Sequence, residues 1–359
     1  MLRGIFLLFL HGITATITSS SFSIIVTKIG NQNIHTLQNT ITGESIDILS
    51  TWGGKINRIQ LIGSNNKLRD VIYTRCTNLQ NCTAKDLESN ATPGAMLIPW
   101  ANRIYHGTYT FNNKVEHLTK DNSTASQGFL IQGRPMQVIK SISTNTNATL
   151  ILGYDFDGTD IGYPFNIQVH ITYVLSQTGL TVHVDATNLM QSLSAPFMTG
   201  CHPYFNLMHS NFSTSKIVLD RTCTEWNRQW QTIGQVPNGS ATLFTGFNGT
   251  DTIADSHIGC PACGSASNIH WDDGFTSLSS TCPTIEVKVI DGPDTMTLTL
   301  GDGYRFVQIY SGNSQEGVAV EPMSSETNSW NNLDGIVVLE PSETVRFTFG
   351  IKLGKNLQV

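Results

Sequence analysis

Charged residues are scarce in this sequence. Only 13% of its 359 residues are Asp, Glu, Lys or Arg, and the formal net charge is −6. A chain with so few cations has no basic face for nucleic acid, so we expect no nucleic-acid partner. Helical periodicity is hard to find, and no apolar run approaches the roughly 20 residues of a transmembrane helix. We therefore expect no membrane partner for the mature protein.

The sequence is instead rich in glycine, with 31 residues, and in short runs of β-forming residues separated by polar turns. The run 181–186 alternates apolar and polar residues, as a half-buried strand does. Similar runs predict strands at 24–29, 56–61, 107–111, 137–142, 149–156, 166–175, 180–186, 285–290, 295–300, 306–310 and 344–353. This all-β pattern is typical of an antiparallel β-sandwich.

The segment 208–270 is the least regular part of the chain, and we interpret it as loops over the sandwich rather than a second domain. No internal repeat or long linker interrupts the sequence. Residues 22–359 are therefore predicted to form a single domain.

Residues 1–21 have the features of a secretory signal peptide. Arg3 precedes the short apolar run 4–10, and small Thr and Ser residues follow as far as Ser21. A buried first strand is the alternative interpretation. Export also agrees with seven Asn-x-Ser/Thr sequons, which predict a glycosylated, secreted protein: Asn81, Asn90, Asn122, Asn147, Asn211, Asn238 and Asn248.

Seven cysteines suit an oxidising compartment, and the odd number requires at least one unpaired thiol in a monomer. Cys76 and Cys82 are the local pair that we favour, because the polar gap between them forms a natural small loop. Cys260 and Cys263 either close a tight loop or pair with Cys282 or Cys223. No second close pair of ligands accompanies this C-x-x-C segment, so we expect no metal site.

A histidine and a glutamate stand at the ends of two predicted strands. His202 lies within the run 200–207, Gly-Cys-His-Pro-Tyr-Phe-Asn-Leu, and Glu321 ends the apolar run 318–320. Histidine exchanges protons near neutral pH, so the two side chains make a candidate acid/base pair. Cys201, next to His202, is expected to be a buried free thiol.

The segment His202-Pro-Tyr-Phe-Asn-Leu resembles the central motif of the aldose 1-epimerases, or galactose mutarotases. Matches to further signatures of this family extend in order from about residue 50 to the C-terminus. They are Asn102-Arg103-Ile104 with Gly107–Phe111, Gly162–Phe165 with Thr172–Leu175, Asp272–Phe275, and Glu321-Pro322-Met323 with Asn328. The resemblance implies a large two-sheet sandwich of the galactose mutarotase type, with the site in a cleft on one sheet.

The resemblance also implies the roles of individual residues in mutarotation, which needs no cofactor or metal. Glu321 corresponds to the catalytic base and His202 to the catalytic acid. Arg103 and Asp272 correspond to sugar-binding residues, although the neighbouring Asp273 is an equal candidate from sequence.

Two further residues are candidates for substrate binding. Asn102 either orients Arg103, touches the sugar or serves a turn. Tyr204 either stacks on the apolar face of the sugar or packs in the core.

Gln127 departs from the family pattern, because it stands before Gly128 where the family usually has a histidine. A glutamine can bind a sugar hydroxyl but cannot carry a proton. This departure suggests a non-catalytic carbohydrate-binding relative as an alternative. A hexose-6-phosphate epimerase is a third possibility, but it would call for more Arg or Lys near the site. The leading interpretation is a secreted enzyme that acts on a free monosaccharide such as glucose or galactose. The preferred sugar and the oligomeric state are left open.

Overall fold

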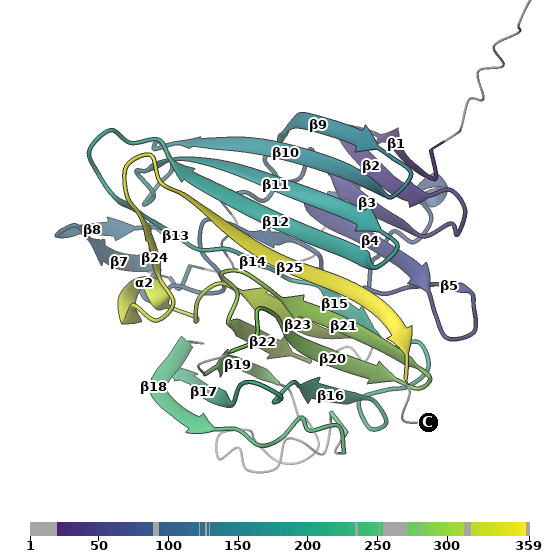
Figure 1. Cartoon of the computed structure of the whole chain (residues 1–359). Coiled ribbons are helices and arrows are strands. Elements are labelled where there is room, and N and C mark those ends of the chain that lie inside the picture. The colour runs from purple at the N-terminus through teal and green to yellow at the C-terminus, as the bar shows by residue number, and fades with distance from the viewer. Residues whose placement is uncertain are drawn as a thin grey trace, which may run out of the picture.

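The computed structural model describes residues 20–88, 93–121, 123–125, 128, 130–233, 236–250, 252–253, 271–278, 281–311 and 317–356. Its strands form three large antiparallel sheets (Figure 1). The first sheet has five strands in sequence order: β1 (Phe22–Ile29), β2 (Gln32–Asn39), β3 (Ser45–Leu49), β4 (Lys55–Ile62) and β5 (Leu68–Asp70).

The second sheet, which we call the β12 sheet, has eight strands and crosses the front of Figure 1. Their order is β16 (Lys216–Leu219), β20 (Ile285–Asp291), β21 (Asp294–Leu300), β25 (Thr344–Lys355), β12 (Gly179–Asn188), β11 (Asn166–Ser176), β10 (Asn147–Asp157) and β9 (Gln137–Ser143).

The third sheet, the β23 sheet, also has eight strands, seven of them in one path. The path is β18 (Val236–Leu243), β17 (Trp226–Ile233), β19 (Asp272–Ser277), β22 (Phe306–Tyr310), β23 (Gly317–Met323), β14 (Gly200–Cys201) and β6 (Met96–Leu97), with β15 (Tyr204–Asn206) also paired to β23. Smaller elements are the ribbons β7 (Thr108–Phe111) with β8 (Lys114–His117) and β13 (Ala195–Phe197) with β24 (Val337–Leu339), and the helical turns η1 (Leu79–Asn81), α1 (Ala84–Glu88), η2 (Tyr105–Gly107) and α2 (Ser329–Asn332).

The core lies between the sheets and follows from the alternation of the strands. In β12, Val182 and Val184 are buried, whereas His183 and Asp185 are only half-buried. The two valines belong to the same core cluster as Val320 of β23. Apolar residues of one face therefore pack between the β12 and β23 sheets, as in a sandwich. The predicted antiparallel β-sandwich is confirmed, and each predicted strand segment coincides with a strand.

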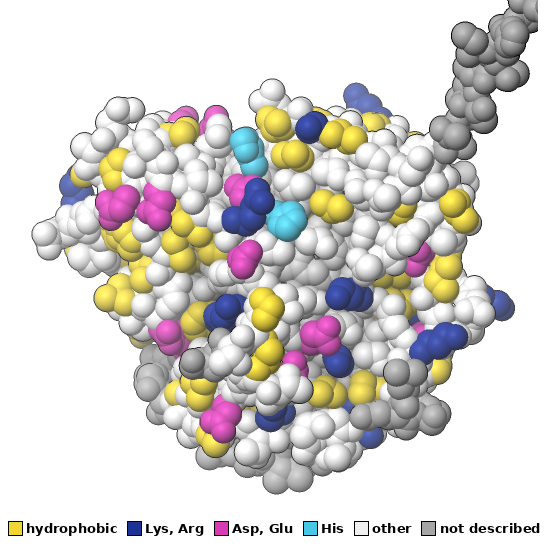
Figure 2. All heavy atoms as spheres, viewed as in Figure 1, with side chains coloured by type: hydrophobic (Ala, Val, Ile, Leu, Met, Phe, Trp, Pro, Cys, Tyr) yellow, Lys and Arg dark blue, Asp and Glu magenta, His cyan; other side chains and the backbone are white. Residues whose placement is uncertain are grey.

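The opposite face of the β12 sheet carries polar and charged side chains. Asp185 faces His170 of β11 and Arg346 of β25 in register. Arg346 binds the Asp185 carboxylate through two hydrogen bonds of 2.7 and 2.9 Å. Figure 2 shows histidine, basic and acidic side chains gathered over these strands. The residues of β11 and β12 on this face are mostly half-buried, and the face is partly open to solvent.

The interpretation of 208–270 as loops was wrong in part, because β16, β17 and β18 lie within that range. Strand β17 joins the β23 sheet through pairs such as Trp226 with Ser277 and Arg228 with Phe275. Its successive residues Asn227 and Arg228 lie on opposite faces of the strand and are both polar. The hydrophobic alternation that marks a strand is therefore weak here.

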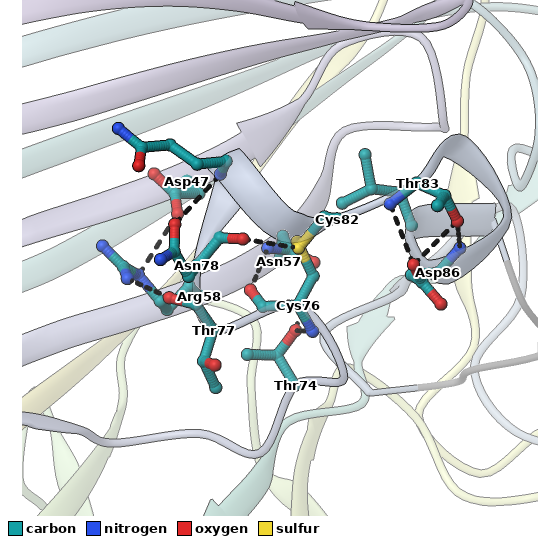
Figure 3. The surroundings of a disulfide bond; sticks show 12 residues. Asp47, Asn57, Arg58, Thr74, Cys76, Thr77, Asn78, Cys82, Thr83 and Asp86 are labelled. Carbon is teal, nitrogen blue, oxygen red and sulfur yellow. Dashed lines mark hydrogen bonds and ion pairs between the residues drawn. A yellow bond between two sulfur atoms is a disulfide. The ribbon is translucent and has the colours of Figure 1, made fainter.

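The predicted Cys76–Cys82 disulfide is confirmed, and Figure 3 shows it beside η1. Asn57 Nδ2 donates to the carbonyl oxygen of Cys76 over 3.3 Å, which ties this loop to β4. A second disulfide joins Cys223 to Cys282. Cys201 is buried and free, as expected.

Several predictions fall outside the described residues. Cys260, Cys263 and residues 1–19 of the expected signal peptide are among them, while β1 begins at Phe22. No helix in the described ranges is both long enough and apolar enough to span a bilayer.

Candidate active site

Glu321 faces away from the core of the sandwich. Strands β22 and β23 pair Gln308 with Glu321 in register. Ile309 and Val320, which follow and precede these two residues, belong to the core cluster. Because side chains alternate along a strand, Gln308 and Glu321 share the other face of the sheet.

His202 meets Glu321 on this face. It lies between β14 and β15, which both pair with β23. Its backbone is fixed by two hydrogen bonds: its own N–H donates to Ala95 over 2.9 Å, and Gly94 N–H donates to its carbonyl oxygen over 2.8 Å. His202 Nε2 then lies 3.1 Å from Glu321 Oε1. The Tyr204 ring stacks on the imidazole at 5.0 Å between centroids, with 14° between planes.

Burial controls the protonation of this pair, because His202 is 3% exposed and Glu321 is 1% exposed. Burial lowers the pKa of His202 to about 3, and the Arg103 charge lowers it as well. Burial raises the pKa of Glu321 well above its usual value, with a further upward contribution from Asp272 and an opposing one from Arg103. Both directions favour a pair that holds one proton in total, on Glu321 beside a neutral imidazole.

Each member of the pair also has a second polar atom that can bind a ligand. Nδ1 of His202 and Oε2 of Glu321 are buried and have no hydrogen-bond partner among the described residues. A buried polar atom without a partner is costly, so these two atoms mark where a polar ligand would be bound favourably.

Arg103 and Asp272 lie beside the pair. Arg103 Nη2 is 3.3 Å from Asp272 Oδ2, and Gln308 Nε2 donates to Asp272 Oδ1 over 2.7 Å. The Asp272 side chain is 34% exposed, so this carboxylate stays open to solvent. The site thus combines one acid/base pair with a cation and a carboxylate, the groups that can hold the hydroxyls of a polar ligand.

The sequence profile of the Aldose 1-epimerase family matches residues 34–352 of this chain. The chain belongs to the aldose 1-epimerase family. It is therefore an isomerase of the epimerase type.

One relative and two solved structures illustrate what this chain is similar to. The uncharacterised Escherichia coli K12 protein YihR is 26% identical over 266 residues, which cover 72% of the epimerase described here and 78% of YihR. A galactose mutarotase-like protein from Clostridium acetobutylicum has the same fold, with a TM-score of 0.75, 17% identity, and coverage of 94% of this chain and 99% of that one. Galactose 1-epimerase from Lactobacillus acidophilus gives a TM-score of 0.73 at 14% identity, with 94% and 100% coverage.

The fold of the epimerase distinguishes Asp272 from Asp273. Successive side chains of β19 point to opposite faces, and Asp273 is buried against Arg228 Nη2 at 2.9 Å. Arg228 also lies over the Trp271 ring at 4.7 Å. Asp273 is thus part of an internal ion pair, and Asp272 is the aspartate next to Arg103.

The two remaining candidates from the sequence differ in what can be said of them. Asn102 is fully buried, with Nδ2 3.8 Å from Met323 Sδ. Its positive φ of 58° supports the turn role that we considered. Gln127 lies outside the described residues, whereas the carbonyl oxygen of the adjacent Gly128 accepts from Ile98 N–H over 3.0 Å.

Gln308 is the site residue that the sequence analysis missed. It is 1% exposed. Gln308 lies opposite Glu321 in the register of β22 and β23, and its side chain donates to Asp272. A signal existed in the sequence, because Gln308 is a polar residue in the middle of the apolar strand Phe-Val-Gln-Ile-Tyr. In the described part of the epimerase, no group of three His, Cys, Asp or Glu side chains is arranged to hold a metal ion.

Proposed function

We propose that this epimerase is a secreted aldose 1-epimerase that interconverts the α and β anomers of free aldohexoses such as glucose or galactose. The observation that carries the proposal is the buried contact between His202 Nε2 and Glu321 Oε1 at 3.1 Å, beside the Arg103–Asp272 pair. Anomer exchange needs a proton acceptor for the C1 hydroxyl and a proton donor for the ring oxygen O5. Both oxygens are bonded to C1, and this pair supplies both groups.

The reaction begins on the closed ring, with the proton of the pair on His202 and Glu321 ionised. Glu321 removes the proton of the C1 hydroxyl, the C1–O5 bond breaks, and O5 takes the proton of His202. The product is the open-chain aldehyde with a C5 hydroxyl, next to a neutral imidazole and a protonated Glu321. The directions of the two pKa shifts favour this product state, so ring opening starts from the less populated arrangement, in which the proton has moved from Glu321 to His202.

Ring closure repeats these steps in reverse on the other face of the aldehyde. After rotation about C1–C2, O5 attacks C1 and returns its proton to His202, while the former carbonyl oxygen takes the proton of Glu321. The pair regains its initial state, so no proton is consumed. General acid and base groups of this kind typically contribute about 10²–10⁴-fold each.

Arg103 and Asp272 have the role of holding the sugar in this proposal. The guanidinium of Arg103 has donors in a fixed fork, and the open carboxylate of Asp272 accepts from hydroxyls. Tyr204 fixes the imidazole plane through its stacking contact. These groups determine which ring edge faces the acid/base pair.

Export through residues 1–21 is the second part of the proposal. The disulfides Cys76–Cys82 and Cys223–Cys282 support it, because disulfides persist in oxidising compartments. The sequon residues Asn81, Asn211 and Asn248 are exposed, as glycan acceptors need to be. N-terminal sequencing of the protein collected from the medium of expressing cells should begin near residue 22, and a glycosidase that removes N-glycans should lower its apparent mass.

Polarimetry on freshly dissolved α-D-glucose and α-D-galactose tests the enzymatic part. The purified protein should speed the approach to anomeric equilibrium in proportion to its concentration. Binding of either sugar without any acceleration above the buffer rate would instead favour the carbohydrate-binding alternative.

A further inference from the structure

The turn that carries Arg103 is held in an unfavourable backbone conformation. Asn102, immediately before it, has φ 58°, and His106, three residues after it, has φ 52°. Non-glycine residues in this left-handed region persist where surrounding contacts hold them. The direction of the Arg103 side chain therefore depends on what fixes this turn from outside.

Asn328 contacts the backbone of this turn at two points. Its N–H donates to the carbonyl oxygen of Arg103 over 2.8 Å. Its side-chain Oδ1 accepts from the backbone N–H of Tyr105 over 2.9 Å. The two hydrogen bonds hold the two ends of the segment 103–105. They join residues that are more than two hundred positions apart in the sequence.

The support behind Asn328 is rigid. Asn328 precedes α2 and itself adopts φ 65°, ψ 20°. Trp330 of α2 is 2% exposed and packs against Trp100 at 5.6 Å and Tyr109 at 4.4 Å between ring centroids. The same segment follows directly on β23, the strand that ends with Glu321 and the two residues after it.

We propose that Asn328 is a positioning residue that aims Arg103 at the sugar site and ties this turn to the strand of Glu321. The inference rests on the proposed function, in which Arg103 binds the sugar. Asn328 acts through the backbone of residues 103–105 and need not touch the substrate. Because Arg103 holds the sugar in both the ground state and the transition state, loss of its orientation should raise KM more than it lowers kcat.

Three variants separate the side-chain contact from the backbone conformation. Asn328→Gly keeps the left-handed conformation and the N–H but removes Oδ1, which accepts from Tyr105 N–H and from Asn331 Nδ2. Asn328→Asp retains an acceptor oxygen at the same position and also tolerates the left-handed region. Asn332→Ala is the matched control, because Asn332 donates to Glu326 and Thr327 of the same segment and to no residue of 102–105.

Polarimetry of the purified variants should distinguish them by KM rather than by kcat. We expect Asn328→Gly to raise the KM for the preferred aldose by about tenfold, in line with the loss of the hydrogen bond that holds Tyr105, with kcat within about twofold. Asn328→Asp and Asn332→Ala should both stay within about twofold of the wild type in KM. An unchanged KM in Asn328→Gly, an equal rise in Asn332→Ala, or no recovery in Asn328→Asp would overturn the assignment.

Amide hydrogen exchange at Tyr105 tests the same contact without any activity measurement. Exchange should be faster in Asn328→Gly than in the wild type, and close to wild type in Asn328→Asp and Asn332→Ala. Unaltered exchange at Tyr105 in Asn328→Gly would refute the positioning role. A wild-type protein that is inactive on all aldoses would refute the proposed function instead, and the exchange result would still decide whether Asn328 holds the turn.

Discussion

Replacing Glu321 by glutamine should remove both proton-transfer functions of the site at once. Glutamine has nearly the same shape, so its Oε1 can still lie near His202 Nε2, which is 3.1 Å from Glu321 Oε1 in the wild type. The amide cannot take a proton from the C1 hydroxyl. It also removes the negative charge that stabilises a protonated His202, whose pKa burial lowers to about 3. At neutral pH the imidazole of the variant is therefore neutral, and its one N–H is too weak an acid to protonate O5.

The magnitude follows from this coupling. Loss of a general base typically costs about 10²–10⁴ in rate, and 10³ corresponds to about 4 kcal/mol of transition-state stabilisation. If the pair acts as one unit, His202→Asn should cost a similar factor, mainly in kcat. The double variant should then be slower than either single variant by less than about tenfold, because residues that act together are strongly non-additive.

Polarimetry with α-D-glucose and α-D-galactose measures all four proteins, and thermal unfolding checks that each variant is folded. The comparison of interest is the rate of the double variant against the product of the two single effects. Near-normal activity in Glu321→Gln would remove Glu321 from the base role. Single effects that multiply in the double variant would show that the two groups act independently and would refute the shared-proton argument.

Three further predictions concern protonation and the departure at Gln127. Since burial raises the pKa of Glu321 and lowers that of His202 to about 3, the singly protonated pair should persist across pH 6.5, and kcat/KM measured by polarimetry should show no inflection there; a half-maximal loss at pH 6.5 would indicate an isolated histidine. Burial, with repulsion from Arg75, lowers the pKa of buried Lys55 from 10.5 to about 8, so the folded state favours the neutral amine and loses stability as pH falls from 10.5 towards 8. At about 1.4 kcal/mol per pH unit this is about 3 kcal/mol, and denaturant unfolding should show this pH dependence in the wild type but not in Lys55→Met. Gln127→His should leave the mutarotase rate equal or higher, because the proton-transfer pair is already complete; an inactive wild type that this change activates would contradict the enzymatic interpretation.

The motif residues His202 and Glu321 come together in the fold because each lies at the end or edge of a strand that the sequence pattern predicts. Glu321 ends an apolar run, and His202 follows a short strand that pairs with the same β23. What the sequence could not decide was orientation. The choice between Asp272 and Asp273 depends on which face of β19 meets Arg103, and that is fixed by pairing with β17 and β22.

The remaining misses have a common physical origin in long-range contacts. Strand β17 can carry a buried arginine, Arg228, because Asp273 is its internal partner. No local sequence pattern reveals such a partner. The partner of Cys223 was equally undecidable, since several pairings were open and only the fold brings Cys282 to it. Gln308 was overlooked because its neighbours are apolar, although a buried amide in such a strand needs a partner and thereby signals a site.

The disulfide between Cys223 and Cys282, which have a sequence separation of 59, encloses β17, β18 and β19 in one covalent ring. Asp272 belongs to this ring. A protease that cuts the chain once anywhere between the two cysteines would open the ring without separating the pieces. The nicked protein would migrate as one species until a reductant is added. Asp272 would also stay held by the pairing of β19 with β22, so a single cut need not end sugar binding. Under the export that we propose, where proteases are present, this linkage would extend the working life of the enzyme beyond the first cleavage.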